Sequence, residues 1–67
     1  MINIKLNGEN RPTKPNATIK DLLTELNINN RYCAVECNLK LVPREKHEEC
    51  TLQDGDRIEI VTLVGGG

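Results

Sequence analysis

The 67-residue sequence contains almost no aromatic side chains: Tyr32 stands alone, and Trp and Phe do not occur. Proteins that hold single-stranded nucleic acids commonly stack the bases on several aromatic rings, so this binding mode is excluded. An excess of basic residues is lacking too, because nine Lys and Arg are balanced by ten Asp and Glu. Without a basic face to attract phosphates, we expect no nucleic-acid partner.

Long apolar runs are absent as well, and no stretch approaches the roughly 20 residues needed to span a bilayer. The N-terminal segment, residues 1–5, lacks the basic start and continuous apolar run of a secretory signal. The three cysteines Cys33, Cys37 and Cys50 are an odd number, which leaves at least one thiol unpaired and favours a reducing compartment. We therefore expect a cytoplasmic protein without a membrane partner.

Apolar residues alternate with polar ones at the start of the chain, at Ile2, Ile4 and Leu6. This period of two predicts a strand with one face on a core. The pair Asn7-Gly8 that follows tolerates the positive φ angles of a tight hairpin, so residues 9–14 are expected to return antiparallel. Because proline cannot donate a backbone hydrogen bond, Pro12 confines the returning strand to an edge of the sheet.

A short amphipathic helix is predicted after residue 18, since apolar side chains recur there at helical spacing, at Ile19, Leu22, Leu23 and Leu26. Thr18 and Asp21 resemble a capping box, and the asparagines that follow the helix are residues that commonly end one. Further strands are predicted over residues 32–37, at Leu41-Val42 and over residues 57–64, with a turn at residues 53–56. Residues 44–50 are expected to form a polar, irregular turn.

Two strands, one helix and three more strands make an α+β domain over residues 1–64, a mixed five-stranded sheet covered on one face by the short helix. The last strand is expected in the middle of the sheet, beside the first strand. On that strand Ile58 and Ile60 take the inward places, so that Val61 and Leu63 face outward. A chain this small leaves no room for a deep cofactor cleft, and we expect no cofactor.

The sequence gives weak support for a metal site and for catalysis by a side chain. Cys33, Cys37, His47 and Cys50 match the composition of a Cys3His zinc site, but the spacings are loose and cross a predicted strand. Cys33 and Cys37 on one strand would lie about 13 Å apart, too far for a disulfide. We interpret the cysteines as packing residues, any further role being open, and His47 as a solvated loop residue without a catalytic role.

The sequence ends in Gly65, Gly66 and Gly67, which have no turn to form and no helix to end. Without side chains, such a tail could enter a narrow channel in a partner and present the terminal carboxylate of Gly67. A carboxylate is a poor electrophile, but transfer to the α-phosphate of ATP would activate it for attack by a sulfur nucleophile. A frayed tail without function is the alternative that the glycines alone leave open.

Three segments carry a resemblance to a known family: residues 38–44 (NLKLVPR), residues 54–60 (DGDRIEI) and residues 64–66 (VGG). The N-terminal hairpin and the start of the predicted helix also occur at the positions usual in this family. The chain therefore resembles the ThiS family of thiamine-pathway sulfur carriers over nearly its whole length. This resemblance implies a ubiquitin-like β-grasp fold and a carrier that is not itself an enzyme. Cys33 and Cys37 depart from the family by standing where aliphatic residues are usual.

In that family the terminal carboxylate is adenylated by a ThiF-type enzyme, converted to a thiocarboxylate with sulfur from a donor such as a cysteine desulfurase, and used by thiazole synthase. The resemblance thus implies that Gly67 reacts and that Gly65 and Gly66 form an arm that enters the partner. We expect partners to dock on Val61, Leu63, Val64 and Arg44. A molybdopterin-type carrier, a modifier joined to lysine and an interaction module without carrier activity are the alternatives.

Overall fold

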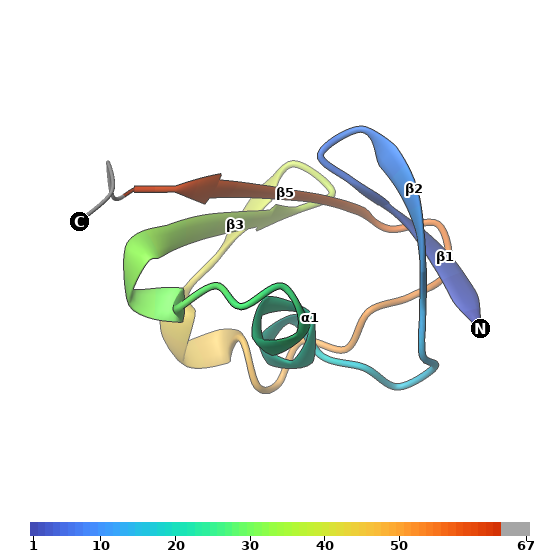
Figure 1. The fold of residues 1–67 in the computed structure, drawn as a ribbon, viewed down its shortest axis with the longest axis horizontal. Helices are drawn as coiled ribbons and strands as arrows, with labels where there is room; N and C mark the ends of the chain where they lie inside the picture. Colours follow the sequence, from blue (N-terminus) through green and yellow to red (C-terminus); the bar gives the residue numbers. More distant parts are fainter. Residues whose placement is uncertain (64–67) are drawn as a thin grey trace.

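In the computed structural model, which describes residues 1–63, the chain forms one mixed sheet with a helix packed against one face (Figure 1). The strands are β1 (Ile2–Leu6), β2 (Glu9–Thr13), β3 (Cys33–Cys37), β4 (Lys40–Val42) and β5 (Arg57–Thr62). Helix α1 spans Ile19–Glu25, and two short 3-10 turns are η1 (Asn30–Tyr32) and η2 (Arg44–Lys46). This arrangement confirms the α+β architecture expected from the sequence.

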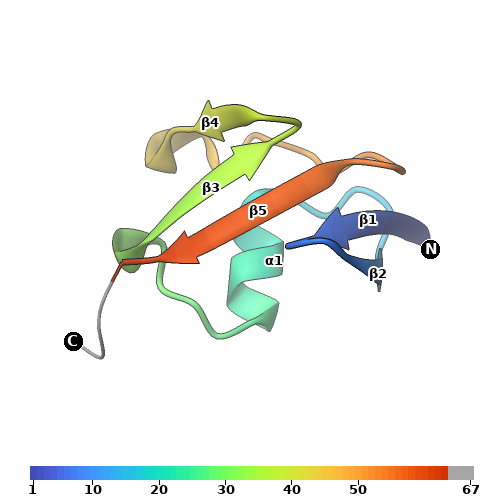
Figure 2. The same ribbon diagram turned by 90° about the horizontal axis from the view of Figure 1, so that it is seen from above.

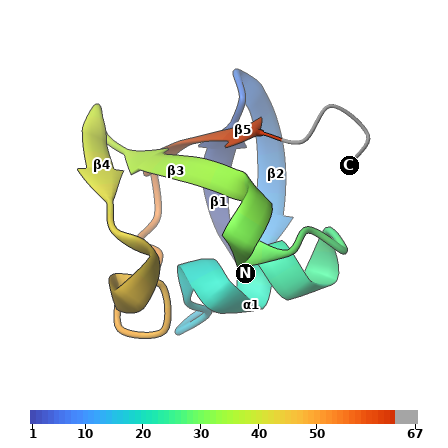
Figure 3. The ribbon, with the colours of Figure 1, turned by 90° about the vertical axis from the view of Figure 1, so that its left-hand side faces the viewer.

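The strands follow the order β2-β1-β5-β3-β4, so that β5 is central as expected. It pairs parallel to β1 on one side and antiparallel to β3 on the other. Seen from above, β5 crosses the middle of the molecule between these two strands (Figure 2). Helix α1 and turn η2 lie on the same side of the sheet (Figure 3), and no helix of residues 1–63 covers the opposite face.

The hairpin between β1 and β2 forms where the sequence predicts it. Asn7 and Gly8 have φ angles of 49° and 87°, values that suit a tight two-residue turn. The register pairs Ile2 with Thr13 and Leu6 with Glu9. Strand β2 is at the edge of the sheet, so the missing N–H of Pro12 costs no ladder hydrogen bond.

Helix α1 begins with the predicted capping box. The Thr18 hydroxyl accepts a hydrogen bond from the Asp21 N–H (3.1 Å), and the Asp21 carboxylate accepts one from the Thr18 N–H (3.0 Å). The helix ends before Asn27, whose φ of 62° cannot continue it. None of the helices in residues 1–63 is long and apolar enough to cross a membrane.

The core lies between α1 and the inner face of the sheet, and its buried members are Ile4, Ile19, Leu22, Leu23, Cys33, Val35, Leu52, Ile58 and Ile60. Most of these residues are the ones that the sequence periodicity places inward. Leu52 is a core residue that the sequence periodicity did not predict, because it lies before β5 in an irregular segment. Its N–H donates to the carbonyl of Ala17 (2.8 Å), which fixes this segment beside the start of α1.

The Asn7 side chain extends the pairing between β1 and β5 beyond the end of β1. Its Oδ1 accepts from the Ile60 N–H at 2.8 Å, and its Nδ2 donates to the Ile60 carbonyl at 3.2 Å. One side chain therefore satisfies both backbone groups of a buried residue in the central strand. From the turn of the hairpin, Asn7 holds the part of β5 that continues past β1.

The strands β2 and β5 end at Thr13 and Thr62, before the expected residues 14 and 64, and one boundary each of β3 and β4 also differs from the expectation. Tyr32 belongs to η1 and not to β3, because the Asn29 side chain accepts a hydrogen bond from the Arg31 N–H (2.9 Å) and starts a 3-10 turn there. Lys40 belongs to β4, since it pairs with Cys37 directly after the β3–β4 turn. None of these differences changes the topology, but the place of Tyr32 matters for the end of β5.

Replacing Asn7 by Gly is expected to lower the free energy of unfolding by about 1–3 kcal/mol, because both backbone groups of Ile60 lose their partner while the positive φ stays allowed. Urea denaturation of the two proteins measures the difference. Asn16→Gly is the matched control: Asn16 has a φ of 70°, is exposed, and makes no side-chain hydrogen bond within residues 1–63. Equal losses in both variants would contradict a structural role for the Asn7 side chain.

Candidate functional site at the end of strand β5

Strand β5 ends beside η1, away from the N-terminus (Figures 1 and 2). Thr62 is opposite Cys33 in the sheet, and the Leu63 N–H donates to the Tyr32 carbonyl at 2.7 Å. Because Tyr32 is part of η1, this turn fixes the last described residue. The expected site residues Val64, Gly65, Gly66 and Gly67 lie outside the described residues.

Val61 and Leu63 have the exposed, outward positions that the alternation along β5 predicts. Val61 is 60% exposed and Leu63 is 63% exposed, whereas Ile60 is 8% exposed. No strand of residues 1–63 covers them, although the neighbouring outward position on β3, Ala34, is partly buried. These two exposed apolar side chains lie within four positions of Gly65 in the sequence, and their docking role stays a prediction.

Arg44 lies close to the same end of the molecule. It belongs to η2 and lines a shallow hollow together with Asn30, Arg31 and Tyr32 of η1. Tyr32 also binds Leu63 through its carbonyl, so the fold places Arg44 near the exit of β5 although 19 positions separate them in the sequence. Arg31 adds a second cation that the sequence analysis missed, because nothing in the local pattern connects it to Arg44.

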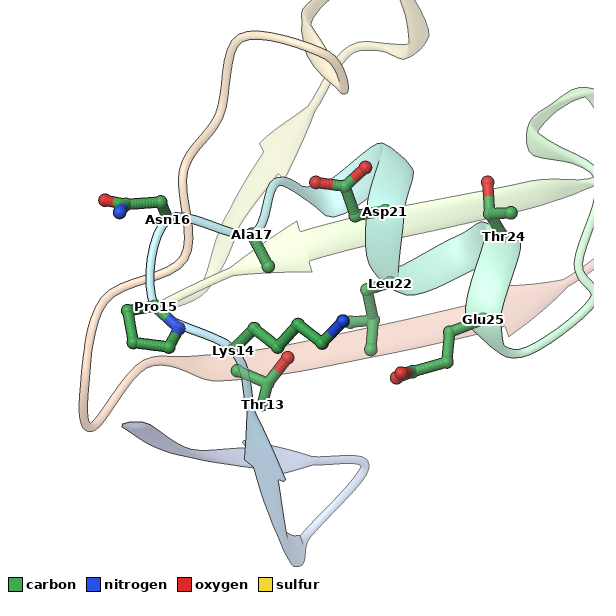
Figure 4. Close-up of a pocket in the computed structure, with 9 residues that line it drawn as sticks. All are labelled: Thr13, Lys14, Pro15, Asn16, Ala17, Asp21, Leu22, Thr24 and Glu25. Carbon is green, nitrogen blue, oxygen red and sulfur yellow. The ribbon is translucent and has the colours of Figure 1, made fainter. Parts of the chain in front are cut away.

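A separate pocket lies between the end of β2 and α1, and Figure 4 shows its lining residues. Thr13 to Ala17 form one wall, and Asp21, Leu22, Thr24 and Glu25 of the helix form the other. None of the residues expected to act in function is among them. The pocket therefore does not belong to the site at the end of β5.

His47 is buried, which corrects its interpretation as a solvated loop residue. The residue is 2% exposed, its Nε2–H donates to the Val42 carbonyl (3.2 Å), and its own carbonyl accepts from the Lys20 N–H (3.0 Å). His47 thus connects the end of β4, through its imidazole, to the start of α1, through its backbone carbonyl. Nδ1 has no hydrogen-bond partner within residues 1–63. Such a position holds the loop in place and gives the ring no access to a substrate.

The three cysteines are free thiols in different environments. Cys33 is buried in the core, whereas Cys37 and Cys50 are partly buried at its edge. Within the part of the chain that the structure describes, no three His, Cys, Asp or Glu side chains gather as metal ligands would. His47 and the cysteines therefore do not form a zinc cluster there.

Cys37 has the most perturbed thiol. Burial, then the negative charge of Asp56, and then the neighbouring Cys50 raise the pKa of Cys37 to about 11. Asn38 bridges this group, since its Nδ2 donates to the Asp56 carboxylate at 3.0 Å and contacts the Cys37 sulfur at 3.6 Å. Burial also raises the pKa of Cys33. Both thiols thus stay protonated at neutral pH.

The sheet order, with the last strand central and one helix across one face, defines a protein of the ubiquitin-like β-grasp class. A solved structure described as the thiamine biosynthesis protein ThiS from Geobacter metallireducens superposes with a TM-score of 0.84 at 29% identity, covering 98% of this chain and all of that one. The family model that matches residues 4–67 is described as the ThiS family.

Curated relatives agree with this match. The sulfur carrier protein ThiS of Bacillus subtilis is 40% identical over 65 residues, which cover 96% of this chain and 98% of that protein. A thiazole synthase of Paramagnetospirillum magneticum is 42% identical over 62 residues; the match covers 92% of this chain but 19% of that much longer protein. The chain belongs to the ThiS family of sulfur carrier proteins.

The raised pKa of Cys37 predicts a loss of stability at high pH. Between its ordinary pKa of 9.0 and its folded value of about 11, the thiol is deprotonated in the unfolded chain before it is deprotonated in the folded one. The free energy of unfolding should therefore fall as the pH rises through this window. Urea denaturation across the window measures the fall, which should be smaller in a Cys37→Val variant. Identical pH dependence in both proteins would argue against the perturbed thiol.

Proposed function

We propose that this chain is the sulfur carrier for the thiazole branch of thiamine biosynthesis and that Gly67 carries the sulfur as a terminal thiocarboxylate. In this proposal the chain is a protein co-substrate and not an enzyme, and it needs no cofactor of its own. A ThiF-type enzyme activates it, a sulfur donor such as a cysteine desulfurase loads it, and thiazole synthase unloads it. Family membership and the exposed end of β5 support the proposal.

The chemistry requires activation from outside the chain. A carboxylate with a reference pKa of about 3.5 is ionised at neutral pH and resists nucleophilic attack. Attack of a Gly67 oxygen on the α-phosphorus of ATP releases pyrophosphate and forms an acyl-adenylate. A sulfur nucleophile then attacks the acyl carbon and displaces AMP. No side chain of this chain has to act as acid, base or nucleophile in either step.

The short reach of the tail connects this chemistry to the surface around Leu63. Gly67 is the fourth residue after Leu63, and a fully extended chain of four residues spans at most about 14 Å. A partner that receives Gly67 must therefore bring its active site within that distance of the end of β5. It then contacts the domain there, where Val61 and Leu63 offer apolar surface and Arg44 offers a charge.

Thiazole synthase is the partner that the comparisons favour. A ThiS-like segment occurs within longer proteins named thiazole synthase, from Paramagnetospirillum magneticum and from Magnetococcus marinus. A carrier joined covalently to the enzyme that consumes its sulfur would be held at high effective concentration. We infer that this chain approaches the same kind of enzyme.

A cytoplasmic location is part of this proposal. All three cysteines are free thiols, a state that a reducing compartment maintains. ATP for the activation step is supplied in the same compartment.

Removing Gly66 and Gly67 is expected to abolish sulfur acceptance while the domain stays folded, because the described core and sheet end before these residues. The assay incubates the chain with ATP, a ThiF-type enzyme and a sulfur donor, and intact mass then reports replacement of one oxygen by sulfur. A truncated chain that still gains sulfur, or that loses its thermal transition, would refute the role of the tail. A full-length chain that appears joined to lysine would indicate a modifier, and one that gains nothing would indicate an interaction module.

Leu63→Asp is expected to raise the KM of the ThiF-type enzyme for the carrier by roughly tenfold or more, since a charge would be buried at the interface. Steady-state adenylation measured by pyrophosphate release gives the KM, and circular dichroism checks the fold. Leu39→Asp is the matched control, because Leu39 is equally apolar and 77% exposed but lies at the β3–β4 turn. Unchanged kinetics in a folded Leu63→Asp protein would exclude Leu63 from docking.

A further inference from the structure

Two arginines from separate turns line one shallow hollow beside the end of β5. Arg31 belongs to η1 and Arg44 to η2, and Asn30 and Tyr32 complete the hollow. Both turns lie on the side of the molecule at which β5 ends (Figures 1 and 2). Because the two arginines are far apart in the sequence, it is the folded sheet that brings them to the same surface.

Hydrogen bonds hold the backbone of both turns in place. In η1 the Tyr32 carbonyl accepts from the Leu63 N–H (2.7 Å), which ties this turn to the end of β5. In η2 the Arg44 carbonyl accepts from the His47 N–H (3.2 Å), and His47 is itself bound to β4 and to α1. The two guanidinium groups therefore extend from fixed points, which lowers the entropy that is lost when a partner binds them.

Neither guanidinium group is neutralised within residues 1–63. Both arginines are exposed, and neither forms an ion pair there. Arg44 also borders a second hollow, whose acidic members are Glu45, Glu48 and Glu49. Glu48 is already paired with Lys20 at 3.1 Å. Glu49 is paired with Lys46 at 3.9 Å. The acidic side chains of residues 1–63 thus leave both arginines open to an anionic group from outside.

The side chains of the hollow fit carboxylates that belong to a protein. A guanidinium group binds a carboxylate through two parallel hydrogen bonds, and the amide of Asn30 and the hydroxyl of Tyr32 add neutral donors. Tyr32 is 48% exposed, and Tyr and Arg are enriched in protein interfaces. A small free anion would stay hydrated in such a shallow hollow, whereas an acidic loop also brings apolar contact.

We propose that this hollow docks an acidic loop of the enzyme that activates the tail, with one carboxylate of the loop on Arg31 and another on Arg44. The inference rests on the proposed function, because its partner is the ThiF-type enzyme that adenylates Gly67. The reach of the tail, at most about 14 Å from Leu63, obliges that enzyme to cover the end of β5 and the arginines beside it. The pair then attracts an enzyme with an acidic rim and repels one with a basic rim.

The test measures binding of the full-length chain to a ThiF-type enzyme without ATP, which separates docking from chemistry. Isothermal titration calorimetry gives the Kd of the wild type, of Arg31→Gln, of Arg44→Gln and of the double variant. We expect each single variant to raise the Kd by roughly fivefold and the double variant by roughly twentyfold. The Kd of the wild type should also rise with the concentration of NaCl, more steeply than that of the double variant.

Arg57→Gln is the matched control. Arg57 is also an exposed arginine, but it begins β5 and lies outside the hollow, and its replacement changes the net charge by the same amount. Its Kd should equal that of the wild type, and circular dichroism checks that every variant is folded. The docking site is overturned by a wild type that does not bind, by a wild-type Kd that salt does not change, or by equal losses in the control and the arginine variants.

Two further measurements separate this inference from the proposed function and from a free ligand. Intact mass after addition of ATP and a sulfur donor tests the function: a wild type that gains no sulfur refutes it, while a Kd that depends on both arginines still supports the docking site. A wild type that gains sulfur but whose Kd is indifferent to both arginines refutes the docking site alone. Saturable binding of ATP to the isolated chain, lost in the double variant, would assign the hollow to a free phosphate and overturn the proposal.

Discussion

The hydrogen bonds that hold β5 between β1 and β3 are the constraint on which the other features depend. The parallel pairing with β1 and the antiparallel pairing with β3 bury Ile58 and Ile60 at the centre of the core. With these two residues turned inward, Val61 and Leu63 must face outward, and the strand must leave the sheet beside η1. The position of the candidate site is thus a consequence of the central strand and its register, without any dedicated loop.

The elements that the sequence predicted well are those set by short-range chemistry. The Asn7-Gly8 turn, the Thr18 cap and the alternation along β5 each depend on residues within a few positions of one another, so their signals survive in the bare sequence. The exposure of Val61 and Leu63 followed from the same alternation. The role proposed for the glycine tail rests on the chemistry of a carboxylate together with the resemblance to a family, and it stays a prediction.

Features that depend on distant contacts could not be predicted. His47 sits among charged residues and looks solvated, but the carbonyl of Val42 and the start of α1 enclose it. The approach of Arg44 to the exit of β5 requires the loop that carries Arg44 to be placed by the finished sheet. The sequence indicates the role of Asn7 in the turn, but it gives no sign that the Asn7 side chain also hydrogen-bonds Ile60.

The parallel pairing of β1 with β5 also constrains how the molecule is made. It joins strands about fifty residues apart, so the centre of the sheet cannot form until the segment of β5 has emerged from the ribosome. In a nascent chain that carries only β1 to β4, the apolar face of α1 stays exposed until β5 joins the sheet. Folding of this domain therefore cannot be completed before β5 is made, and a chain interrupted before β5 has neither a closed core nor the exposed end of β5.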